Sequence, residues 1–182
     1  MSAQINGLVT LAKSGNADAF GELYELYYKE MYCYARCVTG SEILAQDAVS
    51  DAVLSAFEQI KHLKNPKAFK GWIFKILCAA CKRYYTENEK KKSLVYLDDE
   101  NGGYEEPASF ESIELSVELR KALEILSHEE REIVVLSVLG NYRSHEIADI
   151  LDCPSSTVRS KLKRSLKKLR ETLDGENERK GG

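Results

Sequence analysis

The feature that most constrains the fold is a sharp break between two amphipathic helices near the C-terminus. Residues 144–151 place Ile147, Ala148 and Leu151 on one helical face, and Asp152-Cys153-Pro154 then stops that helix. A second helix begins at Ser155 or Ser156 and buries a face made of Val158, Leu162, Leu166 and Leu169. Two helices joined by so short a turn predict a helix-turn-helix.

The second of these helices is strongly basic outside its apolar face, where it carries Arg159, Lys161, Lys163, Arg164, Lys167, Lys168 and Arg170. Hydroxyl side chains and unpaired backbone N–H groups at its start point to where a DNA groove or phosphate would lie. The pattern therefore predicts double-stranded DNA binding. The candidate contacts are Arg143, His145, Ser155, Ser156, Thr157, Arg159, Ser160, Lys161, Lys163, Arg164 and Lys167.

Helical periodicity also dominates the rest of the chain. Apolar residues follow the i, i+3, i+4, i+7 rule over residues 5–12, 20–38, 45–60 and 69–80. Gly40 is predicted to end the second stretch, Ser41 to cap the third, and Asn65-Pro66 to begin the fourth. A further helix is expected over 113–126, and Ser127 with Glu130 forms a predicted capping box before an apolar run. The fold class is therefore all-α.

Charge is divided into blocks along the chain. Residues 61–92 contain ten Lys or Arg and two Glu, and residues 155–182 contain nine Lys or Arg and four acids. Between them, residues 93–118 contain eight acids and no base. From Glu87 to about Ser112 the apolar period is lost, which is typical of a flexible linker. We therefore expect two small helical domains, 1–92 and 113–175, joined by an acidic linker at 93–112 and followed by a disordered tail at 176–182.

The first basic block predicts a second nucleic-acid surface. Cations interleaved with aromatic rings suit single-stranded DNA, because phosphates are neutralised while unpaired bases stack. Trp72 lies in the apolar stripe and is better interpreted as a packing residue. For Tyr84 and Tyr85, stacking on bases and packing at the end of the helix are equally compatible with the sequence. The candidate residues are Lys75, Ala79, Lys82, Arg83, Tyr84 and Tyr85.

An acidic face is predicted on the helix over 42–60, opposite its core stripe. It carries Asp47, Ser50, Asp51, Leu54 and Glu58, in which one apolar residue lies among carboxylates. Such a face suits docking against a basic helical partner. A solvated helix exterior is the ordinary alternative for such a charge pattern.

Neither a catalytic set nor a cofactor site is predicted. The three histidines have no nucleophile or carboxylate at catalytic spacing, and there is no Gly-rich phosphate loop. Cys33 with Cys37 and Cys78 with Cys81 have zinc-compatible spacing, but they lie in apolar helices where cysteine behaves as a small hydrophobe. No stretch approaches the roughly 20 apolar residues of a membrane span, and no export signal is found, so a cytoplasmic protein with reduced thiols is expected.

The order of these motifs resembles that of bacterial sigma-70 family RNA polymerase sigma factors of the short, extracytoplasmic-function type. Residues 18–28, 45–57 and 68–76 resemble conserved region two of that family. Leu126-Ser127, Glu129-Glu130-Arg131, Glu146-Ile147-Ala148 and residues 157–162 resemble its region four. The chain departs from the family pattern at Ser50, Ala79 and Arg83, where the family has glutamine, asparagine and aspartate.

This resemblance implies particular partners. The acidic face would bind core RNA polymerase, and the basic face would bind the minus-10 element and the melted non-template strand. The basic helix of the helix-turn-helix would bind the duplex at the minus-35 element, and an anti-sigma protein is a further implied partner. Two alternatives use the same helix-turn-helix: a transcriptional regulator that acts without the polymerase, and a DNA-processing enzyme such as a recombinase, which the lack of a nucleophile set disfavours.

Overall fold

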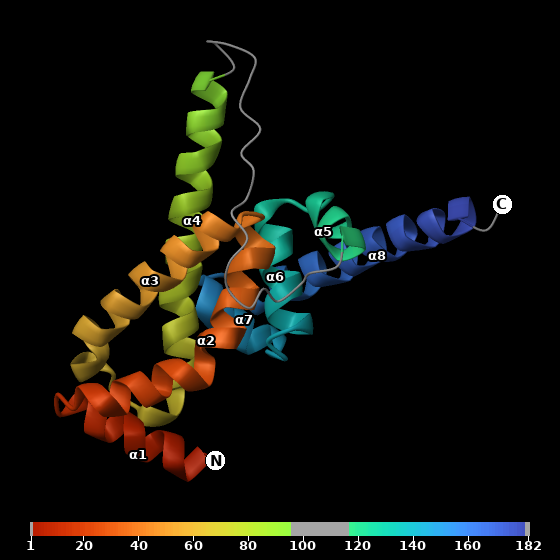
Figure 1. Cartoon of the computed structure of the whole chain (residues 1–182). Helices are drawn as coiled ribbons and strands as arrows, with labels where there is room; N and C mark the ends of the chain where they lie inside the picture. The colour runs from red at the N-terminus through yellow and green to blue at the C-terminus, as the bar shows by residue number, and fades with distance from the viewer. Residues whose placement is uncertain (1, 96–116, 181–182) are drawn as a thin grey trace.

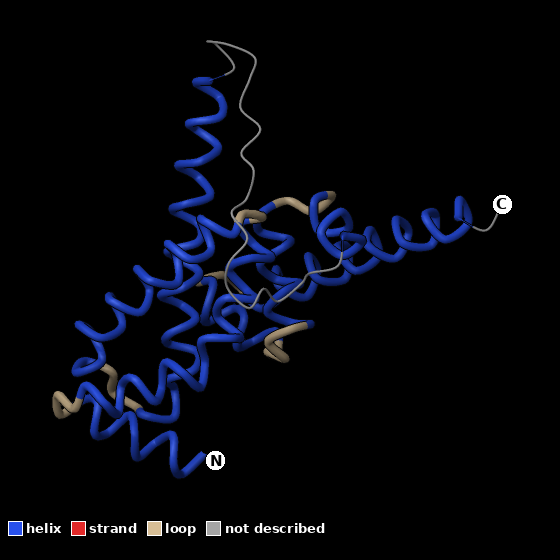
Figure 2. Tube along the Cα trace, viewed as in Figure 1, coloured by secondary structure: helices blue, strands red, loops and turns tan. Residues whose placement is uncertain are grey.

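The computed structural model describes residues 2–95 and 117–180, and every regular element in these two stretches is a helix (Figures 1 and 2). The expected all-α fold is confirmed. The first stretch contains α1 (Ser2–Lys13), α2 (Ala17–Thr39), α3 (Glu42–Gln59), the short 3-10 helices η1 (Ile60–His62) and η2 (Pro66–Ala68), and α4 (Phe69–Val95). The second contains α5 (Val117–Glu124), α6 (His128–Val138), α7 (Ser144–Leu151) and α8 (Ser155–Lys180).

Local chemistry fixes the helix ends where the sequence predicts them. Gly40 ends α2 in the left-handed region (φ 71°), and its N–H donates to the Arg36 carbonyl oxygen at 3.1 Å. Ser41 then caps α3 by accepting from the Leu44 N–H at 3.4 Å. At Ser127 both hydrogen bonds of the capping box with Glu130 are present.

Two helices extend further than their apolar patterns indicate. The apolar period is lost at Glu87, yet α4 continues to Val95, because its last turns consist largely of the good helix formers Glu and Lys. Similarly, α8 continues to Lys180, through most of the predicted disordered tail. The first three residues of the expected linker are therefore helical, whereas residues 96–112 lie outside the described residues, as do residues 113–116 of the predicted helix over 113–126.

The N-terminal bundle is built around α2, against which α3 and α4 pack. The inward face of α3 consists largely of alanine, and Ala45, Ala48, Ala52 and Ala56 are all fully buried. Side chains this small let the backbones of neighbouring helices approach closely. The facing positions carry larger apolar side chains, including the fully buried Leu23 and Leu77. Burying each such leucine contributes about 1.5 to 3 kcal/mol.

The C-terminal bundle contains the predicted helix-turn-helix. Asp152 ends α7 in the left-handed conformation (φ 53°), and α8 begins three residues later. Val158 is fully buried, while Leu162 and Leu169 are partly buried against the core. Leu166, which was expected to be buried, is 44% exposed, although Leu169, three residues further along α8, packs against the core.

The two bundles pack against each other and share one continuous apolar core. The Tyr34 hydroxyl of α2 donates to the Glu132 carboxylate of α6 at 3.4 Å. Arg131 of α6 donates to the Val38 carbonyl oxygen of α2 at 3.3 Å. The Tyr142 ring, in the loop after α6, lies 5.5 Å from the Phe74 ring of α4.

Gly140 makes room for this loop. A Cβ atom at Gly140 would lie 2.6 Å from the Tyr142 ring and 2.8 Å from the Leu136 carbonyl oxygen. Only glycine permits so close an approach without a shift of the backbone. The seating of Tyr142 against α4 therefore depends on Gly140.

Candidate nucleic-acid and protein interfaces

The first turns of α8 form the best-defined candidate for duplex contact. Because Val158 is fully buried, the neighbouring Arg159, Ser160 and Lys163 are turned outward and are exposed. The Arg159 guanidinium donates to the Ser155 hydroxyl oxygen at 3.2 Å, so it lies over the start of the helix. The structure thus brings the predicted hydroxyl and arginine groups together at one helix end. Ser156, Arg164 and Lys167 are also exposed, and Ser155 and Thr157 are half-buried.

Some basic residues of α8 are engaged within the protein. Lys161 forms an ion pair with Glu129, and Lys168 forms one with Glu130 at 2.7 Å. The hydrogen bond from Lys161 lowers the pKa of Glu129, and the hydrogen bond from Lys168 lowers that of Glu130. Lys161, a predicted DNA contact, can therefore bind phosphate only by leaving Glu129.

The two predicted contacts at the start of α7 are on the surface. Arg143 precedes the helix as its N-cap, and its backbone N–H donates to the Glu146 carboxylate at 2.7 Å. The side chains of Arg143 and His145 are both exposed.

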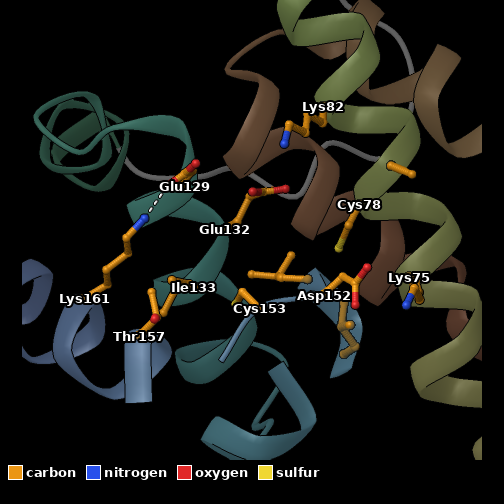
Figure 3. A pocket seen from close by; sticks show the side chains of 13 residues that line it. Lys75, Cys78, Lys82, Glu129, Glu132, Ile133, Asp152, Cys153, Thr157 and Lys161 are labelled. Carbon is orange, nitrogen blue, oxygen red and sulfur yellow. Dashed lines mark hydrogen bonds and ion pairs between the residues drawn. The ribbon is translucent and has the colours of Figure 1, made fainter. Parts of the chain in front are cut away.

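The predicted single-strand surface on α4 faces the C-terminal bundle. Lys75, Ala79 and Lys82 are exposed on one side of the helix, as the spacing predicts, but Lys75 Nζ donates to the Asp149 carbonyl oxygen of α7 at 3.4 Å. All three line a cavity of about 390 Å³. The opposite wall includes Thr157 and Lys161 of α8 (Figure 3).

This cavity brings residues of both predicted DNA surfaces to its two sides. Its volume matches that of a small-molecule pocket and is far too small for nucleic acid to pass between the bundles. The cavity is lined by cations of both surfaces, Lys75 and Lys82 of α4 and Lys161 of α8.

The remaining three α4 candidates divide between two neighbours. The Tyr85 ring stacks on His128 of α6, with ring centroids 4.3 Å apart. Arg83 and Tyr84 instead turn towards α3. There Arg83 forms an ion pair with Asp51, and the Tyr84 hydroxyl donates to the same carboxylate at 2.7 Å.

The acidic face of α3 is exposed as predicted. Asp47, Ser50, Leu54 and Glu58 are exposed, whereas Asp51 is half-buried under Arg83 and Tyr84. Leu54 is 64% exposed, so this acidic face presents one apolar side chain to solvent.

Phe57 differs from its expected position in the core. Its ring makes an edge contact with Phe20 at 5.1 Å, yet the residue is 47% exposed. It lies three residues after Leu54, so both side chains share the outer part of α3. Phe57 is thus a candidate partner-binding residue that the core pattern concealed, although its i, i+3 relation to Leu54 was visible in the sequence.

Among the described residues, no group of three or more His, Cys, Asp or Glu side chains is placed to hold a metal ion. Within the same part of the chain, no helix combines the length and the apolar character needed to cross a membrane.

Two family sequence models match the chain in order. "Sigma-70 region 2" matches residues 23–91, and "Sigma-70, region 4" matches residues 116–169. The ECF RNA polymerase sigma factor SigW of Bacillus subtilis is 25% identical over 187 residues, which cover 95% of this chain and 98% of that protein. The ECF RNA polymerase sigma-E factor of Escherichia coli is 28% identical over 188 residues, covering 96% of this chain and 95% of that protein.

Two solved structures share the fold. CnrH, in complex with the cytosolic domain of CnrY, superposes with a TM-score of 0.71 at 21% identity and covers 94% of this chain and 98% of that chain. The sigma factor RpoE of Bartonella quintana, in complex with the anti-sigma factor NepR, gives a TM-score of 0.67 at 23% identity and covers 85% and 96% of the two chains.

Proposed function

Because the chain belongs to the sigma-70 family of RNA polymerase sigma factors, of the extracytoplasmic-function type, we propose that it binds core RNA polymerase and directs it to promoters. The observation that carries this function is the presence of region two and region four in the family's order, in a chain that aligns with its relatives over nearly their whole length. Catalysis belongs to the polymerase in this proposal, and the chain supplies binding surfaces. It acts where the polymerase is, in the cytoplasm.

Each surface has a proposed role. The outer face of α3 binds the polymerase through Asp47, Leu54 and Glu58, with Phe57 adding apolar area. The α4 surface at Lys75, Ala79, Lys82 and Tyr85 binds the minus-10 element as it melts. The start of α8 enters the major groove at the minus-35 element, as recognition helices do. An anti-sigma protein is a further expected partner.

The packing of the bundles bears on how these surfaces are used. Lys75 and Tyr85 of α4 contact Asp149 and His128 of the C-terminal bundle. Promoter DNA therefore requires the two bundles to separate, and polymerase binding is proposed to hold them apart. The described arrangement is the closed form of the protein.

The function is tested by capturing core polymerase with the purified chain and then measuring promoter-directed transcription. Stable capture with promoter-dependent transcripts is the expected result. Specific DNA binding without any polymerase capture would instead identify a regulator that acts alone.

The acidic face gives a first prediction. The double variant Asp47→Ala/Glu58→Ala is expected to weaken polymerase capture, since both carboxylates are exposed on the outer face of α3 and lie outside the core. Losing two interfacial charges with basic partners costs several-fold or more in affinity. Circular dichroism should show unchanged helix content. Glu22→Ala/Glu25→Ala, on the exposed side of α2, is the matched control, and equal capture by both double variants would exclude α3 as the docking face.

The α4 surface gives a second prediction. Lys75→Ala/Lys82→Ala is expected to reduce open-complex formation more than closed-complex binding, because the proposed ligand of these cations is the separated strand. Permanganate reactivity of the promoter bubble measures the difference. Lys90→Ala/Lys91→Ala, on the exposed end of the same helix, is the control for lost positive charge. Bubble reactivity equal to wild type would place the melting surface elsewhere.

A further inference from the structure

Asp51 of α3 joins two residues of α4 into one cluster, to which the proposed function gives no role. Arg83 forms an ion pair with the Asp51 carboxylate, and the Tyr84 hydroxyl donates to the same carboxylate oxygen at 2.7 Å. The central carbon of the Arg83 guanidinium also lies 5.0 Å from the centre of the Tyr84 ring, over its face. One carboxylate thus holds a guanidinium and a phenol ring against each other.

This cluster is accessible from solvent. The Arg83 side chain is 53% exposed, and Tyr84 is half-buried. Tyr85, the next residue, turns instead to the C-terminal bundle, where its ring stacks on His128. The cluster can therefore be reached on the α3 side of α4 while the two bundles are packed together.

The cluster also continues the surface that is proposed to bind the melted strand. Arg83 follows Ala79 by four residues, so the two lie on the same side of α4. Lys75 and Lys82 are exposed on that side as well. A strand that passes over Lys75, Ala79 and Lys82 therefore reaches Arg83 at the next turn of the helix.

The ion pair decides how Arg83 can bind such a strand. Asp51 compensates its charge and accepts hydrogen bonds from one edge of the guanidinium, so a phosphate contact gains little. The flat faces of the guanidinium are not used by the ion pair. One face lies over the Tyr84 ring, and the other is left for a flat ligand. Unpaired bases stack on guanidinium planes and on aromatic rings.

We propose that Arg83 stacks on one unpaired base of the melted strand, and that Asp51 is the positioning residue that holds the guanidinium in place for it. Tyr84 supports the guanidinium from the opposite face, so ring, guanidinium and base form three layers. Asp51 acts within the protein in this role and does not dock the polymerase. The inference rests on the proposed function, because that function brings the melted strand to α4.

An abasic scan tests the stacking. The chain bound to core polymerase is titrated with a promoter whose minus-10 region is already melted by mismatches, and each non-template base of the bubble is removed in turn. For wild type, removal of the stacked base should weaken binding roughly 5- to 150-fold, which is the contribution of one stacked base. Arg83→Ala should bind the intact bubble more weakly by a similar factor, and removal of that base should then cost at most about twofold.

Arg83→Lys separates stacking from charge and from a purely structural ion pair. Lysine keeps the charge and can pair with Asp51, but it has no planar group. It should therefore behave like Arg83→Ala in the abasic scan. Lys90→Ala, which removes an exposed charge further along α4, should keep the wild-type pattern. A wild-type pattern in Arg83→Lys would overturn the proposal.

The salt dependence of bubble binding tests the role of Asp51. Asp51→Ala frees the Arg83 charge for a phosphate, so the salt slope should become steeper by about 0.7 while the cost of removing the stacked base falls. Arg83→Ala should leave the slope as in wild type, because its charge is compensated in the native protein. If Asp51 only joined α3 to α4, Asp51→Ala would change the unfolding transition and neither of these two quantities, and the proposed role would be wrong.

The two levels of the argument fail in different ways. Polymerase capture is measured first for wild type and each variant, with circular dichroism as the check on folding. Absence of capture by wild type would contradict the proposed function itself. Normal capture and bubble binding, with every base equally costly to remove in wild type and Arg83→Ala, would overturn only the stacking of a base on Arg83.

Discussion

Replacing Leu136 with alanine is expected to lower the free energy of unfolding by about 2 to 5 kcal/mol. Leu136 of α6 is fully buried and lines the same cavity as Tyr34 and Phe74, so it lies where the C-terminal bundle meets the N-terminal bundle. Truncation removes apolar contacts on both sides and enlarges a cavity that cannot collapse fully. Urea unfolding followed by circular dichroism measures the loss.

The same experiment tests whether the bundles share one core. Because Leu136 contacts both, the variant should shift the unfolding of the N-terminal bundle as well, which fluorescence of the single tryptophan, Trp72, reports. Leu54→Ala is the control, since Leu54 is 64% exposed and its truncation should change stability by no more than about 0.5 kcal/mol. A tryptophan transition that is unchanged in Leu136→Ala would mean that the bundles unfold independently.

Replacing Arg159 with alanine is expected to cost about 1 to 3 kcal/mol of binding to the best promoter and to flatten the preference at one base position. The exposed guanidinium lies at the first turn of α8, next to Ser155, where a recognition helix meets base edges. A bidentate contact with guanine is the interaction that such an arginine makes most often. Titration of promoter variants with the polymerase-bound protein measures the loss at each base.

Lys167→Ala is the matched control for that experiment. Lys167 is exposed further along α8, and its closest carboxylate, on Glu171, is 3.6 Å away. If Lys167 contacts only phosphate, the variant should weaken all sequences alike and reduce the salt slope by roughly one. If Arg159→Ala also weakens binding to every promoter equally, Arg159 contacts the DNA backbone. Ser156, Ser160 or Lys163 would then be the residue that contacts the bases.

The sequence predicts the helices and their caps well because these depend on neighbouring residues. Gly40, Ser41 and the Ser127 capping box act over three or four positions, and each is found as expected. The outward position of Arg159 follows from the burial of Val158, its immediate neighbour. Prediction fails at helix ends that lack apolar residues, as in α4 beyond Glu87, where propensity alone continues the helix.

Long-range pairing was not predictable from periodicity. Lys75 and Tyr85 carry the charge and ring that single-stranded DNA requires, but the pattern does not reveal that Asp149 and His128 meet them. The sequence likewise predicts Arg83 as a DNA-binding cation, and it does not reveal that Asp51 of α3 forms an ion pair with it. Leu166 and Phe57 fit apolar stripes whose outer edges the neighbouring helices do not cover.

The shared core has a consequence for the order in which the protein is made. Its contacts join residues far apart in the chain: Tyr34 with Glu132 and Val38 with Arg131 are separated by 98 and 93 positions. The ribosome completes α1 to α4 well before α6 emerges, and N-terminal units generally fold first during synthesis. A nascent chain at this stage presents Tyr34 and Phe74, which are buried in the finished protein, without the cover of α6 and the loop that follows it. For that interval, chaperones, nucleic acid and other nascent chains have access to a surface that the finished protein covers with its own C-terminal half.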